Sequence, residues 1–330
     1  MKRLIGTIIA LFAFLAVAFV SEVNKKNAEK KTPTVGILQT MSHPALDQIH
    51  RGIIQGLKDE GYIEGKNLKI DFQNAQGDQS NLKSMSDRFS QENATVTIGI
   101  ATPAVQSLAN TSGNIPVVMG AVSDPLGAHL VKSLAHPGGK ITGVQDRQPI
   151  ASQLALMQEI LPKAKNIGVI YTSSDDSSAS EYREFRRLAE ATGLKVIPYT
   201  ITSTNDIEQV AQTMVGKVQA VYVPTDNTVA SGIATLLKAT NSAKIPVFPA
   251  ADTMVKSGGL ATMCVSQFDM GILTGQMAGQ ILHGKKPAAL PVRRVTHYET
   301  VINEKAAHEL NITIPNSVIQ AAQKKGRIIK

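Results

Sequence analysis

Short apolar runs alternate with amphipathic stretches along most of the chain. In the first half, apolar runs predict buried strands at residues 35–38, 68–72, 95–101 and 117–122. Apolar residues that recur every three to four positions predict helices at residues 46–57, 81–90 and 104–110. Strands that alternate with helices in this way are typical of a parallel sheet with helices on both faces.

The second half repeats this order. Apolar runs predict strands at residues 167–171, 195–199, 220–223 and 247–248. Helical spacing predicts helices at residues 181–190, 205–215, 229–240 and 269–283. Residues 173–180 are polar and rich in Ser, which predicts a loop before the first of these helices.

The two halves also share short sequences. Gly36-Ile37-Leu38-Gln39-Thr40 opens the first half, and Gly168-Val169-Ile170-Tyr171-Thr172 opens the second. The tripeptide Ile-Pro-Val follows 79 residues after Gly36 and 77 residues after Gly168. We therefore predict two α/β lobes of one design, with a cleft between them that could enclose a small ligand.

These patterns divide the chain into segments. We predict a targeting segment and tether at residues 1–32, lobe one at 33–143 with 269–292 returning to it, lobe two at 144–268 with 293–322 completing it, and a basic tail at 323–330. Residues 136–146, at the join of the repeats, contain Pro137, three Gly and a short apolar run. This composition favours a crossover that acts as a hinge, although an ordinary surface loop would also fit.

The N-terminal segment has the features of an export signal. Lys2 and Arg3 precede an uncharged apolar run at residues 4–20, which is at the short limit for spanning a bilayer. Ala16-Val17-Ala18 fits the small-x-small pattern of a signal peptidase site. A cleaved signal peptide and a retained membrane anchor both fit, and in either case we expect the folded body to be exported.

The formal net charge of +8 is concentrated in two segments, residues 1–31 and 323–330. The remaining residues carry equal numbers of acidic and basic groups, so we expect no groove for nucleic acid. The single cysteine, Cys264, lies in an apolar stretch. We therefore expect no internal disulfide and a buried, unreactive thiol.

Small hydrogen-bonding residues follow the predicted strands. Ligands of parallel sheets bind beyond the carboxyl ends of the strands, near the free N–H groups of the next helices. Such a site would hold a carboxylate on N–H groups and hydroxyls and an ammonium on Asp. Each residue could instead cap a helix, so the prediction rests on their convergence. The predicted polar ligand-binding residues are Gln39, Ser42, His43, Thr102, Ser123, Asp124, Gln145, Ser173, Ser174, Asp226, Asn227 and Asp252.

The sequence lacks the motifs of enzymes that would use such a cleft. It contains no glycine-rich nucleotide motif and no G-x-S-x-G, and its seven His have no zinc-ligand spacing. The Ser residues at 173–178 have no base beside them in the sequence. We therefore expect a binding protein with no catalytic residue, cofactor or metal.

Several motifs together resemble one known family. They are Gln39-Thr40-Met41-Ser42-His43-Pro44-Ala45-Leu46-Asp47, Gly61-Tyr62-Ile63-Glu64-Gly65-Lys66-Asn67, Ala75-Gln76-Gly77-Asp78, Ala101-Thr102-Pro103-Ala104, Ala121-Val122-Ser123-Asp124-Pro125, Ile141-Thr142-Gly143-Val144, Pro224-Thr225-Asp226-Asn227 and Gly284-Lys285-Lys286-Pro287. The chain resembles the tryptophan/tyrosine-binding group of ABC-transporter substrate-binding proteins over roughly residues 33–320, most of all the Gram-positive tryptophan-binding proteins. No Cys follows the apolar run for lipid attachment, and in this the chain resembles members held on the membrane by an uncleaved helix.

The resemblance implies a type I periplasmic-binding fold, with two Rossmann-like lobes and ligand in the cleft. It implies a permease and an ATPase as partners and an aromatic amino acid as ligand, tryptophan first and tyrosine or phenylalanine next. We expect a monomer outside the cytoplasm, either secreted, in the periplasm of a Gram-negative host, or held on the cell surface.

The ligand's aromatic ring would need an apolar slot. The candidates are Tyr171, Phe248, Phe268, Met41 and Met254, each of which could instead be a core residue. We assign the ligand ammonium to Asp226 or Asp252. The ligand carboxylate is assigned to Thr102, Ser123 and the amides of Ser173 and Ser174.

Two other functions fit the same fold. A ligand-sensing receptor subunit would have the same site, and sequence does not separate it from a transport protein. An exported α/β hydrolase is disfavoured because no nucleophile–base motif is present.

Overall fold

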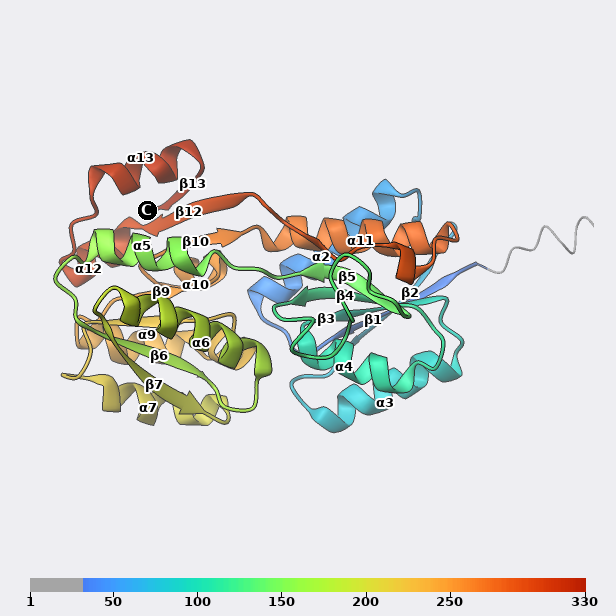
Figure 1. Cartoon of the computed structure of the whole chain (residues 1–330), viewed down its shortest axis with the longest axis horizontal. Coiled ribbons are helices and arrows are strands. Elements are labelled where there is room, and N and C mark those ends of the chain that lie inside the picture. The colour runs from blue at the N-terminus through green and yellow to red at the C-terminus, as the bar shows by residue number, and fades with distance from the viewer. Residues whose placement is uncertain (1–31) are drawn as a thin grey trace, which may run out of the picture. The chain divides into compact units, whose positions relative to one another are not determined.

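Lobe one is built on a six-stranded parallel sheet. The computed structural model describes residues 32–330 (Figure 1), so the predicted signal or anchor at residues 1–31 lies outside the described part. The strand order is β11-β5-β4-β3-β1-β2, and every adjacent pair is parallel. The strands are β1 (Thr34–Gln39), β2 (Lys69–Asn74), β3 (Val96–Ile100), β4 (Val117–Val122), β5 (Ile141–Gln145) and β11 (Arg293–Arg294).

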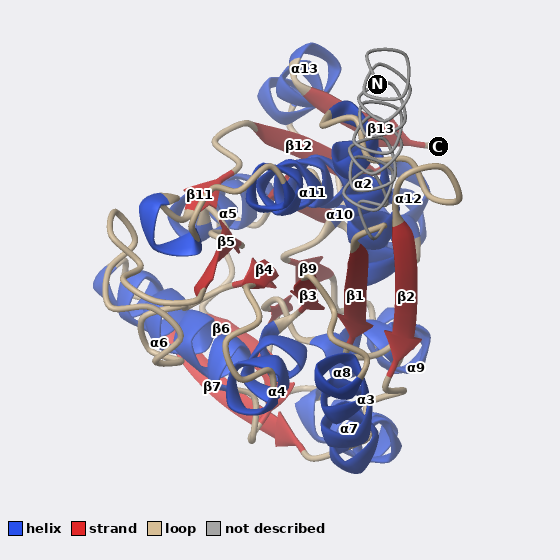
Figure 2. Ribbon diagram, turned by 90° about the vertical axis from the view of Figure 1, so that its right-hand side faces the viewer, coloured by secondary structure: helices blue, strands red, loops and turns tan. Residues whose placement is uncertain are grey.

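Helices cover both faces of this sheet. Figure 2 shows α2 (Pro44–Asp59) and α11 (Gln267–Leu282) on one side of β3 and β4, and α4 (Thr102–Thr111) on the other. The remaining helix, α3 (Gln79–Gln91), packs against α4. Two apolar clusters result, one on each face, and all five residues of β3 are buried. A strand that is apolar throughout is typical of a parallel sheet buried on both faces.

Lobe two contains a four-stranded parallel sheet and a smaller three-stranded sheet. The first has the order β7-β6-β8-β9 and the second the order β10-β12-β13. The strands are β6 (Asn166–Thr172), β7 (Lys195–Ile201), β8 (Ala220–Val223), β9 (Val247–Pro249), β10 (Ala261–Val265), β12 (Tyr298–Asn303) and β13 (Gly326–Ile329). The helices are α5 (Ile150–Ile160), α6 (Asp176–Ala191), α7 (Ile207–Met214), α8 (Asn227–Ser231), α9 (Ile233–Ser242), α10 (Asp252–Lys256), α12 (Glu304–Leu310) and α13 (Asn316–Lys324), with a 3-10 turn at Thr204–Asp206. A second 3-10 turn, Pro287–Ala289, contacts β5 of lobe one.

The chain passes between the lobes three times. It leaves lobe one between β5 and α5, returns between β10 and α11, and leaves again between β11 and β12. The predicted hinge at residues 136–146 is therefore only partly a crossover, because β5, which occupies most of it, belongs to the lobe-one sheet. Residues 146–149 make the crossing itself.

The α2–α11 contact holds the returning segment in lobe one. A Cβ built on Gly52 would lie 2.2 Å from the Phe268 carbonyl oxygen, and one on Gly271 would lie 2.2 Å from that of Ile49. The two helix backbones therefore touch, and only glycine fits at the contact.

Three sequence expectations are wrong. The loop predicted at 173–180 is helical from Asp176, because the Asp175 carboxylate caps α6 by accepting from the amides of Ser177 and Ser178. The helix predicted at 229–240 is split at Gly232 into α8 and α9. The basic tail predicted at 323–330 contains β13, which pairs with β12, since Ile328 and Ile329 are partly buried there. Within residues 32–330, no helix is both long and apolar enough to cross a membrane.

Candidate ligand-binding site

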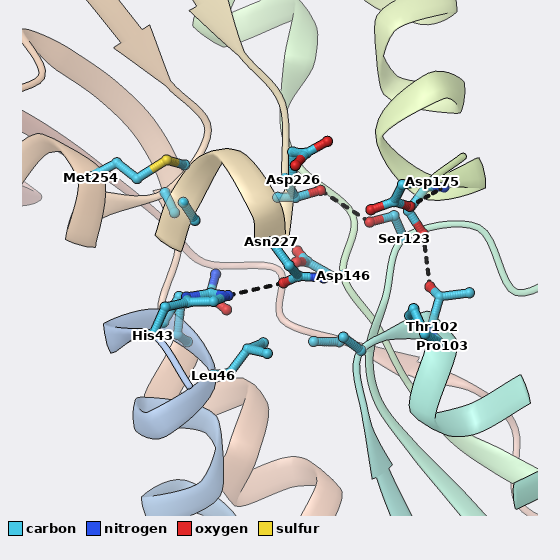
Figure 3. A pocket seen from close by; sticks show the side chains of 18 residues that line it. His43, Leu46, Thr102, Pro103, Ser123, Asp146, Asp175, Asp226, Asn227 and Met254 are labelled. Carbon is cyan, nitrogen blue, oxygen red and sulfur yellow. Dashed lines mark hydrogen bonds between the residues drawn. The ribbon is translucent and has the colours of Figure 1, made fainter. Parts of the chain in front are cut away.

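A cavity lies between the two lobes, beyond the carboxyl ends of their strands (Figure 3). Its volume is about 40 Å³. Both lobes line it, as expected for the crevice of parallel α/β sheets. The lining residues are His43, Ala45, Leu46, Ala101, Thr102, Pro103, Ala121, Ser123, Asp146, Asp175, Ser177, Thr225, Asp226, Asn227, Ala230, Ala251, Met254 and Gln267.

Three side-chain hydrogen bonds join the lobes directly across this cavity. The hydroxyls of Thr102 and Ser177 lie 2.7 Å apart, and those of Ser123 and Thr225 lie 3.1 Å apart. Nε2 of His43 lies 3.0 Å from Oδ1 of Asn227. The structure is therefore a closed arrangement. A volume of 40 Å³ holds only a few water molecules, so a larger ligand would need the lobes to part.

Two carboxylates lie at the polar end of the cavity, Asp146, which is buried, and Asp175, which is partly buried. Burial raises the pKa of Asp146 to about 6. Burial, together with the nearby charge of Asp226, raises the pKa of Asp175 to about 7. Among the described residues, those that line the cavity include no Lys or Arg. When these carboxyl groups are ionised, no cation in the cavity lining balances their charge, which favours a ligand that supplies a cationic group.

Glu181 lies beside this end and positions Thr225. Its carboxylate accepts from the Thr225 amide at 2.9 Å and from the Thr225 hydroxyl. Burial and the charge of Asp146 raise the pKa of Glu181 to about 7. Glu181 also lines a neighbouring cavity of about 110 Å³ together with Asp146 and Ser123.

The opposite end of the cavity is apolar. Figure 3 shows His43, Leu46 and Met254 on the side away from Thr102 and Asp175. Small side chains also line the cavity, among them Ala45, Ala230 and Ala251. One end of the cavity is thus suited to a charged group and the other to an apolar one.

The backbone is unusual where two lobe-one strands enter the cavity. Ala101 after β3 has φ 73° and Ala121 in β4 has φ 59°. These left-handed values are uncommon for a residue other than glycine, and such strain is found preferentially at functional sites. Both residues line the cavity, so the strain coincides with the site.

Five of the predicted residues line the cavity, namely His43, Thr102, Ser123, Asp226 and Asn227. Asp226, however, has other partners for its carboxylate. It accepts from the Thr172 amide at 2.6 Å, the Thr172 hydroxyl at 2.9 Å and the Val229 amide at 2.9 Å. Asp226 therefore caps α8 and links it to β6. This is the helix-capping role that the sequence allowed as the alternative to ligand binding.

Asp252 was assigned to the ligand ammonium, and the structure places it elsewhere. Its carboxylate pairs with Lys256 at 2.8 Å and with Arg327 at 2.9 Å, and it does not line the cavity. The Arg327 partner lies on β13, in the segment that was expected to be a tail. An acid with two cationic partners does not need a third from a ligand.

The structure does not bring the residues of the predicted aromatic slot together at the cavity. Tyr171 stacks on Tyr182 with ring centroids 4.8 Å apart, and Phe248 is buried in the lobe-two core. Phe268 is 38% exposed, and Met41 packs against the lobe-one core. Of the five candidates only Met254 lines the cavity. The alternative of core packing holds for Phe248 because its strand is buried along its whole length.

The remaining predicted residues make contacts near the cavity but do not line it. Gln39 and Ser42 both donate to Asp47, and Ser173 donates to the Ile201 carbonyl. Asp124 accepts from the Gly127 amide, Gln145 donates to the Ser123 carbonyl, and Ser174 is exposed. These groups support the loops around the site.

Sequence reasoning missed Asp146, Ser177 and Gln267 and did not select Asp175 or Thr225. Asp175 and Thr225 stand among the polar strand ends, so their position was a usable signal. Asp146 closes the predicted crossover, but nothing in the local pattern marks it as a site residue. Within the described residues, no group of three or more His, Cys, Asp or Glu side chains could hold a metal ion.

Comparison with known proteins gives the family. Residues 34–325 match the family described as ABC transporter substrate binding protein. The chain is 36% identical over 292 residues to a tyrosine-binding protein of Clostridioides difficile, covering 88% of this chain and 85% of that one.

Two solved structures are similar throughout. An ABC domain from Streptococcus pneumoniae in complex with L-Trp is 44% identical, with a TM-score of 0.87, covering 91% of this chain and 100% of that one. A ligand-free, open substrate-binding protein with adhesive properties from Clostridium difficile is 34% identical, with a TM-score of 0.70, covering 90% and 99%. The fold is that of the periplasmic binding proteins. With a match across nearly all the described residues, the chain belongs to the family of ABC transporter substrate-binding proteins, which bind their substrates and are not enzymes.

Proposed function

We propose that this protein captures an aromatic amino acid in the cavity between its lobes, L-tryptophan first and tyrosine or phenylalanine next. It then delivers the ligand to the permease and ATPase of an ABC importer. The relatives that bind L-Trp and tyrosine support this class of ligand. The observation that carries the proposal is the division of the cavity into an acidic end and an apolar end.

The acidic end suits the ligand ammonium. Asp146 and Asp175 are enclosed carboxylates without a cationic partner lining the same cavity, so an ammonium would compensate their charge. They replace Asp226 and Asp252 in this role. The hydroxyls of Thr102, Ser123 and Ser177 and the start of α4 suit the ligand carboxylate.

Binding requires the lobes to separate and close again. The present structure has direct contacts across the cleft and a higher TM-score to the L-Trp complex than to the open, ligand-free protein. These observations support a hinge motion about the three crossovers. We further propose that the protein acts outside the cytoplasm as a monomer, secreted or held at the membrane by its N-terminal segment.

Fluorescence titration tests the ligand. The chain contains no Trp, so emission excited selectively from L-tryptophan comes from the ligand alone. We expect the ligand emission to shift to the blue, with saturation at 1:1 stoichiometry, as the indole leaves water. The ligand recovered from the protein afterwards should be chemically unchanged. Absence of any shift or calorimetric heat with L-tryptophan, tyrosine and phenylalanine would contradict the ligand class.

Transport is tested separately, in cells that depend on external tryptophan. Deleting the gene should abolish uptake of labelled L-tryptophan, and the intact gene should restore it. Binding without any effect on uptake would instead favour a ligand-sensing receptor subunit.

A further inference from the structure

We infer that His43 accepts a hydrogen bond from the donor group on the ligand's aromatic ring, so that the site favours tryptophan and tyrosine over phenylalanine. This inference rests on the proposed function and goes beyond it by naming the residue that selects among aromatic amino acids.

The hydrogen bond to Asn227 sets the tautomer of His43. Nε2 of His43 lies 3.0 Å from Oδ1 of Asn227, a carbonyl oxygen that can only accept. Nε2 therefore carries the ring proton and donates it. In a neutral imidazole, Nδ1 is then an acceptor with a free lone pair.

This acceptor has no partner in the protein. His43 is only 7% exposed, and its Nδ1 is buried without a hydrogen-bond partner among the described residues. Buried polar atoms are nearly always paired, so an unpaired one in a site calls for a group supplied from outside. Because His43 lines the cavity, a bound ligand can supply that group.

The surroundings keep the ring neutral. Burial lowers the pKa of His43, and this outweighs the bond to Asn227 and the charges of Asp47 and Asp226, which act in the other direction. A neutral ring retains the acceptor at Nδ1, whereas a protonated ring would donate from both nitrogens.

The position of His43 matches the ring of the ligand rather than its charged groups. His43 lies with Leu46 and Met254 at the apolar end, away from Asp175 (Figure 3). An indole N–H and a phenol O–H can each donate to Nδ1, while a phenyl ring cannot. Bound phenylalanine would leave Nδ1 buried and unpaired, which is the situation in which hydrogen-bonding sites reject analogues most strongly.

The unmodified protein provides the first test. Calorimetry would compare L-tryptophan with L-benzothienylalanine, in which sulfur replaces the indole N–H at nearly constant shape, and with L-phenylalanine. We expect the sulfur analogue to bind about tenfold more weakly or worse, and phenylalanine to be weaker still. Equal affinity for tryptophan and its sulfur analogue would overturn the inference.

A variant provides the second test. His43→Leu removes the acceptor, so the affinity ratio of tryptophan to the sulfur analogue should fall close to one. His308→Leu changes an exposed histidine on α12 and should leave the ratio as in the unmodified protein. A ratio unchanged by His43→Leu would also overturn the inference.

The outcomes separate this inference from the proposed function. If no aromatic amino acid binds, both the proposed function and the role of His43 are overturned. If tryptophan and its sulfur analogue bind equally tightly, only the role of His43 is overturned. If His43→Leu does not fold, nitrogen NMR of the unmodified protein decides. We expect an Nε2–H tautomer whose Nδ1 resonance shifts with tryptophan and not with the sulfur analogue.

Discussion

At the scale of residues, Asp175 combines two roles in one side chain. Its Oδ1 accepts from the amides of Ser177 at 2.9 Å and Ser178 at 3.4 Å, which caps α6. The same residue lines the cavity, where no Lys or Arg among the described residues balances its charge. Capping and ligand binding, which looked like alternatives in the sequence, are here compatible.

Asp175→Asn separates the two roles. An Asn side chain caps a helix about as well as Asp, so α6 should remain intact. The negative charge is lost, and we expect the affinity for L-tryptophan to fall about tenfold or more. Calorimetry measures this, with Asp176→Asn, an exposed neighbour, as the matched control. Unchanged affinity in Asp175→Asn would contradict the assignment of the ligand ammonium.

The raised carboxyl pKa values predict opposite effects of pH on binding and on stability. Asp146 has a pKa of about 6, and Asp175 and Glu181 have pKa values of about 7, all above the ordinary value. A raised carboxyl pKa contributes stability that is complete below the ordinary pKa and is lost as the pH rises through 6 to 7. The ligand-free protein should therefore lose this contribution towards alkaline pH.

Ligand binding should respond in the other direction. Charged carboxylates attract an ammonium, so the affinity for L-tryptophan should increase between about pH 5 and about pH 7.5, where the ligand charge is constant. Calorimetry across this range measures the affinity. Scanning calorimetry measures the stability of the ligand-free protein and of Asp175→Asn. The variant should become more stable relative to the unmodified protein as the pH rises. Affinity that is flat or falls with pH would contradict the prediction.

At the scale of elements, the contact between α2 and α11 fixes where the chain rejoins lobe one at Gln267. Glycines on both helices bring the backbones into contact, with Gly52 and Gly56 on α2 facing Gly271 and Gly275 on α11. This contact returns the chain to lobe one after β10. It also fixes the starts of both helices, from which His43 and Gln267 reach the cavity.

Gly52→Ala should destabilise the protein. The added Cβ would lie 2.2 Å from the Phe268 carbonyl oxygen and 2.8 Å from the Gly271 Cα, so the helices must move apart. We expect a loss of about 1–3 kcal/mol in the free energy of unfolding, the usual cost of overpacking. Denaturant unfolding measures it. Gly139→Ala, at an exposed position with no atom within 4 Å of the new Cβ, is the control and should change stability little.

At the scale of the whole described chain, residues 32–330, the proposed function requires the lobes to move about three crossovers. The contacts that close the cleft include single side-chain hydrogen bonds, such as the Thr102–Ser177 and Ser123–Thr225 hydroxyl pairs. Such contacts are weak enough to break during opening, since a single hydrogen bond contributes only about 1 kcal/mol. The closed form can therefore release its ligand.

A disulfide across the cleft would test this motion. The Thr102 and Ser177 hydroxyls are 2.7 Å apart, so Thr102→Cys with Ser177→Cys should form a disulfide in the closed protein. We expect the oxidised double variant to exclude added L-tryptophan. Reduction should restore binding, at an affinity below that of the unmodified protein because the Thr102 and Ser177 hydroxyls are themselves assigned to the ligand carboxylate. Cys264 is buried and its thiol pKa is raised, so it should not interfere. Rapid binding by the fully oxidised variant would contradict entry through lobe opening.

Much of the fold was predictable because it follows from local patterns. The buried strands β3, β4 and β6 are apolar runs, and the repeated Gly36 and Gly168 segments place two similar units in order. The ends of these strands also predicted His43, Thr102, Ser123 and Asn227 at the cavity, since carboxyl ends of parallel strands meet at one edge. Periodicity and strand polarity are local properties, and they therefore appear in the sequence itself.

The choice among the acids was decided only by the tertiary structure. The Asp226 carboxylate accepts a hydrogen bond from Thr172, 54 residues earlier, and the Asp252 carboxylate pairs with Arg327, 75 residues later. Asp146 and Asp175 look no different in sequence, yet they are the carboxylates left at the cavity without a cation. By itself the sequence determined the family, the two lobes and the strand ends that line the cavity. Whether a polar group is already paired depends on partners far away along the chain, and only the folded chain brings those partners together.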